Sequence, residues 1–441
     1  MTQRATEPGT AVSDFLADAS FPGGLGVAVS GGSDSLALLY LLADWASASG
    51  TPLHAVTVDH NLRLEAAAEA EFVARIAARL SVSHSTLKWD GPDTTGNLSD
   101  QARRARYALM ANWARTKGIG AIALGHTADD QAETFLMRLA RGSGVDGLAR
   151  MLAHRQLHEV TFLRPLLSLR RDDLRNLLQG VNQPWIDDPT NDDKRYDRVR
   201  MRQMLPGLAD LGLTIQALNN TAANLATARD ALDHYCRVEG RRLLTQDQGG
   251  DITIPHADWC DLPDEIARRL MNAALAHMAG PGYPPRGRAV AQLMNALRAE
   301  KGMTLNGCLI QTDGKTFRIT RETAAVSDVF TCVQDCLSQT IPPQTWDSRW
   351  RILGPFQPGD VIRATGEEGL SACPNWRETG LARPAMLAGP SVWRNDEMIA
   401  APLAGYTPAH GLQQSAALHG DNFRANLIRG PKELAMTLTT H

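Results

Sequence analysis

The sequence predicts an α/β fold: a parallel sheet forms the N-terminal domain, and a mainly helical domain and a small α+β C-terminal domain follow it. Two observations lead to this prediction. Between about residues 25 and 125, short apolar strands alternate with longer helical patterns, and polar, glycine-containing segments follow the first and last of these strands. Such alternation is typical of parallel sheets with helical crossovers. A chain of 441 residues can form two or three domains, each with its own core.

The predicted elements follow one another in a regular order. In the N-terminal domain they are strand 25–29, helix 36–42, strand 53–58, helix 65–80, strand 82–88, helix 98–117 and strand 119–124. Later segments are predicted as a helical stretch at 209–244, a strand at 252–254, helices at 266–279 and 289–297, and a hairpin at 309–320. We therefore expect domains at 1–210, 211–335 and 345–441, with Pro342-Pro343 as a linker.

The segment Ser30-Gly31-Gly32-Ser33-Asp34-Ser35 joins the first strand to the first helix, and its composition predicts a phosphate cradle. Two successive glycines let the backbone turn sharply and bring its N–H groups close to an anion. The following helix adds unpaired amides and a positive dipole end, with Ser33 or Asp34 expected at the N-cap. A flexible surface loop is the competing interpretation, but the flanking strand and helix favour a cradle.

This cradle is not a Walker A loop, because it contains no lysine. The Gly-Lys-Thr at 314–316 lacks the glycine that the Walker motif requires five positions earlier, where Leu309 stands. We interpret it as the turn of the predicted hairpin, since Asp313-Gly314 separates two apolar runs. A different kind of ATP chemistry is therefore indicated.

A second polar segment begins at Gly125, directly after strand 119–124. In the helix expected there, His126, Asp130 and Glu133 are spaced i, i+4 and i+7, which places them on one face. The apolar side chains at 135, 136 and 139 are expected to point into the core. Because parallel sheets bind ligands beyond the carboxyl ends of their strands, the polar face should share a cleft with the cradle. A solvated helix face and a divalent metal site stay open as alternatives.

Residues 30–35 match the S-G-G-x-D-S loop of the PP-loop ATP pyrophosphatases, which cleave ATP between its α and β phosphates. Together with the segment 125–134, the chain closely resembles the tRNA(Ile)-lysidine synthetase family. Further matching motifs are V-D-H-x-L-R at 58–63, Q-A-R-x-x-R-Y at 101–107, R-G-S-G at 141–144, an expected R-P-L-L strand at 164–167 and D-x-[ST]-N at 188–191. Val199 departs from the family's R-N-x-x-R pattern, in which asparagine is usual. The resemblance is strong over about the first half of the chain.

The resemblance implies a Rossmann-like N-terminal domain of the adenine-nucleotide α-hydrolase type and an ATP-dependent, AMP-forming ligase. Members of the family join free L-lysine to C2 of cytidine 34 in the CAU anticodon of tRNA(Ile), which switches its codon and amino-acid identity. The intermediate is an O2-adenylated cytidine, and diphosphate is the other product. ATP and Mg²⁺ are the implied cofactors, with Asp34 as the candidate magnesium ligand, and a cytoplasmic location is expected.

The site residues that the resemblance implies form four groups. ATP binding is assigned to Ser30, Gly31, Gly32, Ser33, Asp34, Ser35, Val58 and Gly125; lysine binding to Asp130 and Glu133; catalysis to Asp34, His126, Asp130, Glu133 and Arg198; and a tRNA or phosphate clamp to Arg103, Arg106 and Arg202. Guanidinium groups suit phosphate and carboxylate partners, but structural ion pairing is the competing role of each arginine.

Basic residues are concentrated at the end of the predicted N-terminal domain. They are Arg138, Arg141, Arg150, Arg155, Arg164, Arg170, Arg171, Arg175, Lys194, Arg195, Arg198, Arg200 and Arg202. Because the chain as a whole carries a net charge of -3, binding of tRNA requires such a local concentration. An ordinary solvated helix surface is the alternative.

Composition argues against several other classes of protein. No apolar stretch is long enough to span a bilayer and the N-terminus has no signal-peptide pattern, so no membrane partner is expected. The six cysteines all lie in the second half of the chain, whereas tRNA thiolases on this fold use cysteines near the nucleotide. Another PP-loop enzyme, a thiolase or an amidotransferase-like ligase, is the alternative function, and a non-catalytic regulator is the third. The oligomeric state stays open, with a homodimer as one option.

Overall fold

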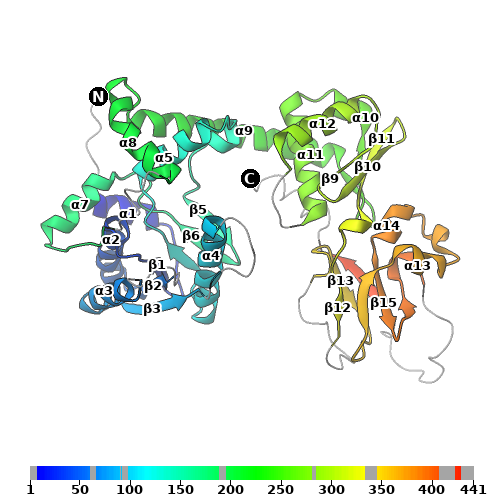
Figure 1. Cartoon of the computed structure of the whole chain (residues 1–441), viewed down its shortest axis with the longest axis horizontal. Helices are drawn as coiled ribbons and strands as arrows, with labels where there is room; N and C mark the ends of the chain where they lie inside the picture. Colours follow the sequence, from blue (N-terminus) through cyan, green and yellow to red (C-terminus); the bar gives the residue numbers. More distant parts are fainter. Residues whose placement is uncertain are drawn as a thin grey trace. The chain divides into compact units, whose positions relative to one another are not determined.

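The structure is a computed structural model that describes residues 7–59, 66–89, 91, 98–187, 195–280, 285–332, 345–406 and 423–428. The chain divides into two compact units, Met1–Arg229 and Asp230–His441, both drawn in Figure 1. The predicted linker Pro342-Pro343, the motif at 188–191 and most of the motif at 58–63 lie outside the described residues. The three predicted domain boundaries stay predictions.

A six-stranded sheet in the order β3-β2-β1-β4-β6-β5 forms the centre of the N-terminal unit. Its strands are β1 (Leu25–Ala28), β2 (Leu53–Asp59), β3 (Ser83–Lys88), β4 (Ala121–Ala123), β5 (His154–Leu157) and β6 (Val160–Leu163). All neighbours pair in parallel except β5, which forms an antiparallel hairpin with β6. The predicted parallel α/β fold is confirmed. The expected R-P-L-L strand is wrong, because residues 164–167 lie in the turn that follows β6.

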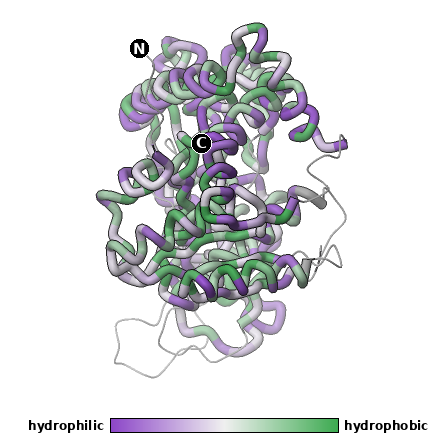
Figure 2. The backbone as a smooth tube through the Cα atoms, turned by 90° about the vertical axis from the view of Figure 1, so that its left-hand side faces the viewer, coloured by the Kyte–Doolittle hydropathy of each residue, from purple (hydrophilic) through white to green (hydrophobic). Residues whose placement is uncertain are grey.

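Helices cover both faces of this sheet, as parallel crossovers require. The unit contains α1 (Pro8–Leu16), α2 (Ser33–Ser49), α3 (Ala66–Arg79), α4 (Leu98–Thr116), α5 (Ala128–Leu139), α6 (Val145–Leu148), α7 (Arg171–Gly180) and α8 (Asp197–Asp210), and α9 (Ile215–Leu243) begins in it and ends in the second unit. Apolar side chains of α1, α2, α3 and α7 pack on one face, and those of α4 pack on the other. Green and purple residues alternate along helices in Figure 2, as expected of helices with one face on a core.

A third apolar cluster joins α5 to α8 and α9. It consists of Ala132, Phe135, Leu205, Leu218 and Ala222, all of them buried. This packing places the charged face of α8 beside α5. The continuous helical pattern expected at 209–244 is interrupted at 211–214, where Gly212 turns the chain with a φ of +85°.

The second unit combines helices with three antiparallel sheets. The sheet orders are β7-β8-β11-β10-β9, β12-β14-β15-β16 and β13-β17. The strands are β7 (Thr245–Gln246), β8 (Ile252–Pro255), β9 (Met303–Leu305), β10 (Cys308–Thr312), β11 (Thr316–Arg321), β12 (Phe330–Thr331), β13 (Trp350–Leu353), β14 (Val361–Ala364), β15 (Pro390–Arg394), β16 (Glu397–Ala400) and β17 (Arg424–Leu427). The α-helices are α10 (His256–Cys260), α11 (Asp264–Ala279), α12 (Gly287–Arg298), α13 (Gly366–Ser371) and α14 (Arg383–Leu387). Short 3-10 helices are Thr323–Ala325, Trp376–Thr379 and Pro402–Ala404.

The predicted hairpin at 309–320 is confirmed. Strands β10 and β11 pair antiparallel across a turn in which Gly314 has a φ of +81°. The carboxylate of Asp313 accepts the backbone N–H groups of Lys315 and Thr316, at 2.9 and 2.7 Å. The Gly-Lys-Thr sequence at 314–316 therefore belongs to the turn of this hairpin and the start of β11.

Asp251 is a fully buried carboxyl group at the start of β8. Its Oδ2 accepts the hydroxyl of Thr320 at 2.8 Å and Nη1 of Arg318 at 3.3 Å, while Oδ1 has no hydrogen-bond partner among the described residues. Burial and the nearby Asp247 carboxylate raise the pKa of Asp251 to about 7, against the opposing effect of Arg318.

We expect the free energy of unfolding of the wild type, relative to Asp251→Asn, to fall as pH rises from about 4 to about 7. In this window the folded protein keeps a proton on Asp251 that the unfolded chain has released, so folding is penalised increasingly until both states are ionised. The rise in the pKa of Asp251 from its ordinary value of 3.8 to about 7 corresponds to about 4 kcal/mol. Urea unfolding of both proteins between pH 4 and 8.5 measures this. A difference that does not change with pH would contradict the burial argument.

Candidate active site

The phosphate-cradle segment closes on itself through Ser35. The Ser35 hydroxyl accepts the backbone N–H of Ser30 at 3.1 Å and donates to the carbonyl of Gly32 at 3.1 Å. Gly31 adopts a φ of +87°, and its carbonyl accepts the N–H of Ile186 at 2.9 Å. The predicted strand-to-helix turn is therefore present. The expected N-cap at Ser33 or Asp34 is wrong: Gly32, in an extended conformation, caps α2, so both residues lie in its first turn.

The two glycines of the cradle should respond differently to alanine. At Gly31 a Cβ would lie 2.7 Å from Cδ1 of Ile186 and the positive φ would be strained, so we expect Gly31→Ala to cost about 1 to 3 kcal/mol. At Gly32 the nearest atom would be 3.7 Å away and the backbone is extended, so Gly32→Ala should stay within about 0.5 kcal/mol. Urea unfolding of the N-terminal unit measures both. Equal costs would contradict the account of this turn.

The end of β4 lies against the cradle. A Cβ on Gly125 would lie 3.1 Å from both N and Cα of Ser35, so glycine permits the close approach of these two backbones. Val58, the remaining ATP-site candidate, is half-buried near the end of the adjoining strand β2. The structure thus places Gly125 against the cradle, and Val58 on a strand next to the one that leads into it.

Helix α5 begins with a capping box. Thr127 is the N-cap; its backbone N–H and its hydroxyl donate to Oδ2 of Asp130 at 2.9 and 3.0 Å, and its Oγ1 accepts the N–H of Asp130 at 3.4 Å. His126 lies before the cap and is therefore not on the helix, which corrects the i, i+4, i+7 prediction. Leu139 is 51% exposed at the last residue of α5, so its expected place in the core is also wrong.

The carboxylates of α5 are buried. Asp130 is 8% exposed and Glu133 is fully buried, so the alternative of a solvated helix face is wrong. Asp129 is buried as well and accepts Nε of Arg170 at 3.2 Å and the backbone N–H of Arg171 at 2.9 Å. Buried carboxylates require cations or hydrogen-bond donors close by.

Arg171 provides a cation that joins both parts of the site. Its Nε donates to Oδ2 of Asp34 at 2.9 Å, its Nη1 to Oε1 of Glu133 at 3.3 Å, and its Nη2 to Oδ1 of Asp130 at 3.4 Å. The side chain is only 13% exposed. We call Asp34, Asp130, Glu133 and Arg171 the carboxylate cluster. In the sequence, Arg171 is one of the concentrated basic residues, and no motif predicts that it belongs to the site.

Two further arginines reach Glu133 from α8. Arg202 donates from Nε to Oε1 at 2.8 Å, and Nε of Arg198 lies 3.4 Å from Oε2. Arg198 also donates to the hydroxyl of Thr134 at 3.4 Å. Both guanidiniums stay partly exposed, at 40% for Arg198 and 33% for Arg202. Arg198 and Arg202 therefore form ion pairs with Glu133 and at the same time remain accessible to a ligand.

The carboxylate cluster shifts the pKa values of its members in opposite directions. Burial raises the pKa of Asp34, and the nearby Asp130 adds to this, while Arg171 opposes it. Burial would also raise the pKa of Asp130, but Arg171, Arg198 and the backbone N–H of Thr127 outweigh burial and lower it. The carboxylates raise the pKa of Arg171 against its burial, so it stays protonated. Asp34 is therefore the more basic of the two aspartates.

His126 faces a group of arginines. Burial, together with the charges of Arg164, Arg106 and Arg103, lowers its pKa to about 3, although Asp130 opposes the shift. The imidazole is therefore neutral near pH 7, and its buried Nδ1 has no hydrogen-bond partner among the described residues. A neutral imidazole beside several guanidiniums can bind an anion through a hydrogen bond without adding charge.

Arg103 and Arg106 lie on α4 over the ring of Tyr107, with distances of 5.4 and 5.7 Å to the ring centroid. Burial would raise the pKa of Tyr107, but the charges of Arg103, Arg106 and Arg164 outweigh it and lower that pKa. Nε of Arg106 is buried and has no partner in the described parts of the chain. Both predicted clamp residues of α4 thus belong to a local excess of positive charge next to His126.

Several of the concentrated basic residues have internal partners. Arg138 donates to the carbonyl of Gly147 at 2.7 Å, and the buried Arg164 donates to that of Leu152 at 2.6 Å. Arg171 is mostly buried as well, whereas Arg170 and Arg202 pair with carboxylates and stay partly exposed. Val199, which stands where the family usually has asparagine, is 5% exposed on α8, so this position packs in the interior.

Among the predicted site residues, Asp34 is the one that suits a magnesium ion. No group of three or more histidine, cysteine or acidic side chains that could hold a metal ion occurs in the described ranges, so the alternative of a metal site at His126, Asp130 and Glu133 finds no support. Asp34 offers one carboxylate beside the cradle, with a hydrogen bond from Ser33 to Oδ1 at 3.0 Å. Mg²⁺ is commonly held by one or two carboxylates together with nucleotide phosphates, and Asp34 fits this arrangement.

This geometry, a glycine turn at a helix N-terminus beside a carboxylate cluster, defines a PP-loop enzyme that uses ATP. Accordingly, residues 9–208 match the PP-loop domain family. The tRNA(Ile)-lysidine synthase of Ruegeria pomeroyi is 46% identical over 407 residues, covering 92% of this chain and 94% of that protein. The enzyme of the same name from Wolbachia pipientis wMel is 35% identical over 74% of this chain and 77% of its own length.

The chain belongs to the tRNA(Ile)-lysidine synthase family and is an ATP-dependent ligase that modifies tRNA. Among solved structures, the U34-tRNA thiolase NcsA from Methanococcus maripaludis with its [4Fe-4S] cluster shows 17% identity and a TM-score of 0.44, covering 50% of this chain and 78% of that chain. No helix within the described ranges is long and apolar enough to cross a membrane.

Proposed function

We propose that this enzyme ligates free L-lysine to C2 of cytidine 34 in the CAU anticodon of tRNA(Ile), with ATP as the activating substrate. The observation that carries the proposal is the carboxylate cluster: Arg171 joins Asp34 of the cradle to Asp130 and Glu133 of α5 at 2.9 to 3.4 Å. Groups for ATP activation and groups for an ammonium-bearing substrate therefore lie within the length of one side chain. The names of the relatives from Ruegeria and Wolbachia support the same reaction.

The cradle at 30–35 would hold the β and γ phosphates. Its turn at Gly31 and the N-terminus of α2 supply backbone N–H groups and a positive dipole end. Asp34 would hold Mg²⁺, which supplies charge stabilisation at the phosphates when bound. Adenine and ribose would lie over the strand ends near Val58 and Gly125.

Lysine would lie between α5 and α8. The buried carboxylates of Asp130 and Glu133 supply negative charge for an ammonium group, and Asp130 carries the lowered pKa that keeps it ionised. The partly exposed guanidiniums of Arg198 and Arg202 suit the α-carboxylate of the same zwitterion. Glu133 accepts hydrogen bonds or ion pairs from three arginines, so it also fixes the arginines that would receive the carboxylate.

His126, Arg103 and Arg106 would lie along the reacting phosphate and the tRNA backbone. The neutral imidazole can donate a hydrogen bond to the α-phosphate, while the guanidiniums balance its charge. Arg106 has a buried Nε that no described group accepts, which favours an anion in its surroundings.

The chemistry has two steps. Cytidine O2 attacks the α-phosphorus of ATP, the bond to the β-phosphate breaks and diphosphate leaves. The neutral ε-amine of lysine then attacks C2, and the C2–O2 bond breaks, so AMP leaves with the cytidine oxygen in its phosphoryl group. A carboxylate that binds the ε-ammonium also stabilises its protonated form, so a base must remove one proton; Asp34, Asp130 and the departing phosphate are candidates.

The fate of the cytidine oxygen tests this proposal. With tRNA(Ile) that carries ¹⁸O at O2 of cytidine 34, ATP and lysine, we expect one ¹⁸O in each AMP formed, measured by mass spectrometry, and lysidine at position 34. AMP without ¹⁸O would mean that O2 is not the adenylated atom and would contradict the proposal. A cytoplasmic location, where ATP and tRNA meet, is proposed with it. A homodimer stays a prediction that sedimentation of the purified chain would test.

A further inference from the structure

Arg171 occupies an unusual position for a cation. It is the first residue of α7, and a helix N-terminus carries a positive dipole end that disfavours a nearby positive charge. Its side chain is nevertheless 13% exposed, and its backbone N–H is bound to Asp129 at 2.9 Å. Burying a guanidinium at such a place is unfavourable unless carboxylates surround it. Three do, and they come from two helices, α2 and α5.

The contacts of Arg171 differ from those of the other arginines at the site. Arg198 and Arg202 reach Glu133 only, among the three carboxylates of the cluster, whereas the salt bridge to Asp34 at 2.9 Å comes from Arg171. Burial raises the pKa of Asp34, and repulsion between the Asp34 and Asp130 carboxylates adds to this rise. A single planar guanidinium with donors on three nitrogens can hold both of them and Glu133 at fixed separations, which a lysine ammonium cannot reproduce in the same geometry.

We propose that Arg171 is a positioning residue that couples the two steps of the reaction. By holding Asp34 of the ATP cradle close to Asp130 and Glu133, it keeps C2 of the adenylated cytidine within reach of the lysine amine. This inference rests on the proposed function, because it requires that Asp34 serves adenylation and that the α5 carboxylates serve lysine. Loss of Arg171 should therefore allow adenylation while lysine transfer fails.

The test compares Arg171→Met and Arg171→Lys with the neighbouring Arg170→Met, all in the full-length enzyme. Arg170 is 44% exposed and pairs with Asp129, so it matches the charge change and lies outside the carboxylate cluster. We measure lysine incorporation into CAU tRNA(Ile), diphosphate release, the KM for lysine and the urea midpoint. For Arg171→Met we expect a KM for lysine raised about tenfold and more than one diphosphate per lysine incorporated, because adenylation releases diphosphate whereas AMP stays on the cytidine until lysine attacks. Arg170→Met should keep one diphosphate per lysine.

A merely structural role would lower the urea midpoint and leave the ratio of diphosphate to incorporated lysine at one, and that result would overturn the proposal. If Arg171→Met does not fold, Arg171→Lys decides: it restores the charge without the three-way contact, so a ratio of one with the wild-type KM for lysine would also overturn it. Failure of the wild type itself to incorporate lysine would instead refute the proposed function.

Discussion

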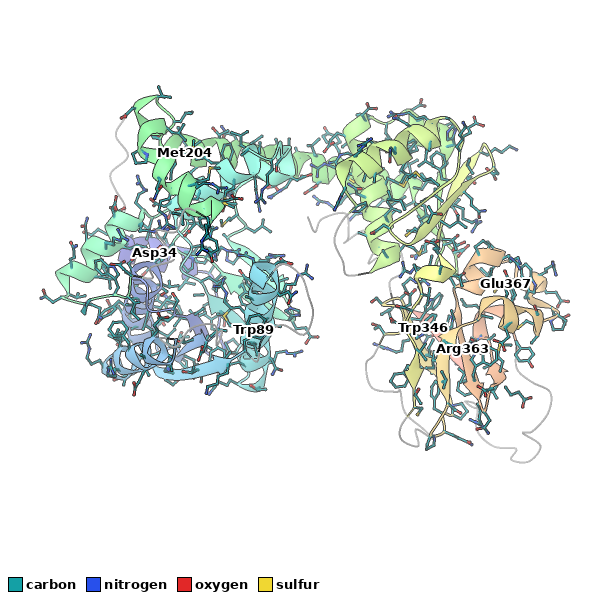
Figure 3. The ribbon with its side chains drawn as sticks, in the orientation of Figure 1. Asp34, Trp89, Met204, Trp346, Arg363 and Glu367 are labelled. Carbon is teal, nitrogen blue, oxygen red and sulfur yellow. The ribbon has the colours of Figure 1, made fainter. Side chains whose placement is uncertain are left out.

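Asp34→Asn is expected to abolish AMP formation, with a loss of roughly a thousandfold or more in its rate. Asp34 lies in the first turn of α2 and is labelled in Figure 3. The substitution removes the negative charge that would hold Mg²⁺ at the phosphates and that Arg171 contacts at 2.9 Å. Burial raises the pKa of this carboxyl and makes its ionised form costly in the folded protein, so removal of the charge partly offsets the loss of the salt bridge to Arg171. Release of AMP from labelled ATP in the presence of tRNA and lysine measures the effect.

Asp44→Asn is the matched control, since Asp44 is exposed on the same helix. It should retain the wild-type rate. If Asp34→Asn released AMP at a rate within tenfold of the wild type while its urea midpoint was unchanged, Asp34 would have no role in activation.

Glu133→Gln is expected to raise the KM for lysine by about tenfold or more and to destabilise the N-terminal unit by about 2 kcal/mol. The carboxylate is fully buried and contacts Arg171, Arg198 and Arg202 at 2.8 to 3.4 Å, so a neutral amide leaves three guanidiniums with one charge fewer. Partial exposure of the two α8 arginines moderates the cost in stability. Lysine saturation curves and urea unfolding measure the two effects separately.

Asp197→Asn provides the comparison for this prediction. Asp197 lies on α8 and pairs with Arg141 at 3.0 Å on the surface, so its loss should change stability by less than about 1 kcal/mol and leave lysine saturation unchanged. An unchanged KM for lysine in Glu133→Gln would show that this residue is wrongly assigned to lysine binding.

Local sequence was sufficient for the parts of the fold and site that depend on neighbouring residues. The alternation of strands and helices predicts the parallel sheet, and the cradle at 30–35 and the segment at 125–134 each follow a strand end, where the sheet brings them together. The errors concern local detail: Gly32 rather than Ser33 or Asp34 caps α2, Thr127 caps α5 so that His126 lies outside it, and Leu139 is exposed at the end of α5.

The role of Arg171 could not be read from spacing, because it lies 137 residues from Asp34 and within a run of other arginines. One physical signal was nevertheless available. The arginine lies where a helix begins, so the helix dipole opposes it, and a cation at such a place requires carboxylates from elsewhere in the fold. Which carboxylates these are depends on the packing of α7 against α2, which no local pattern specifies.

The measurement that tests the central claim most directly is ATP-dependent incorporation of labelled lysine into purified tRNA(Ile) with a CAU anticodon, with tRNA(Met) as control and AMP release followed in parallel. We predict incorporation into tRNA(Ile) alone, with one AMP for each lysine. AMP release without lysine incorporation would keep the adenylating site but require another nucleophile. Absence of both signals would contradict the assignment of the cradle and the carboxylate cluster to one ligase site.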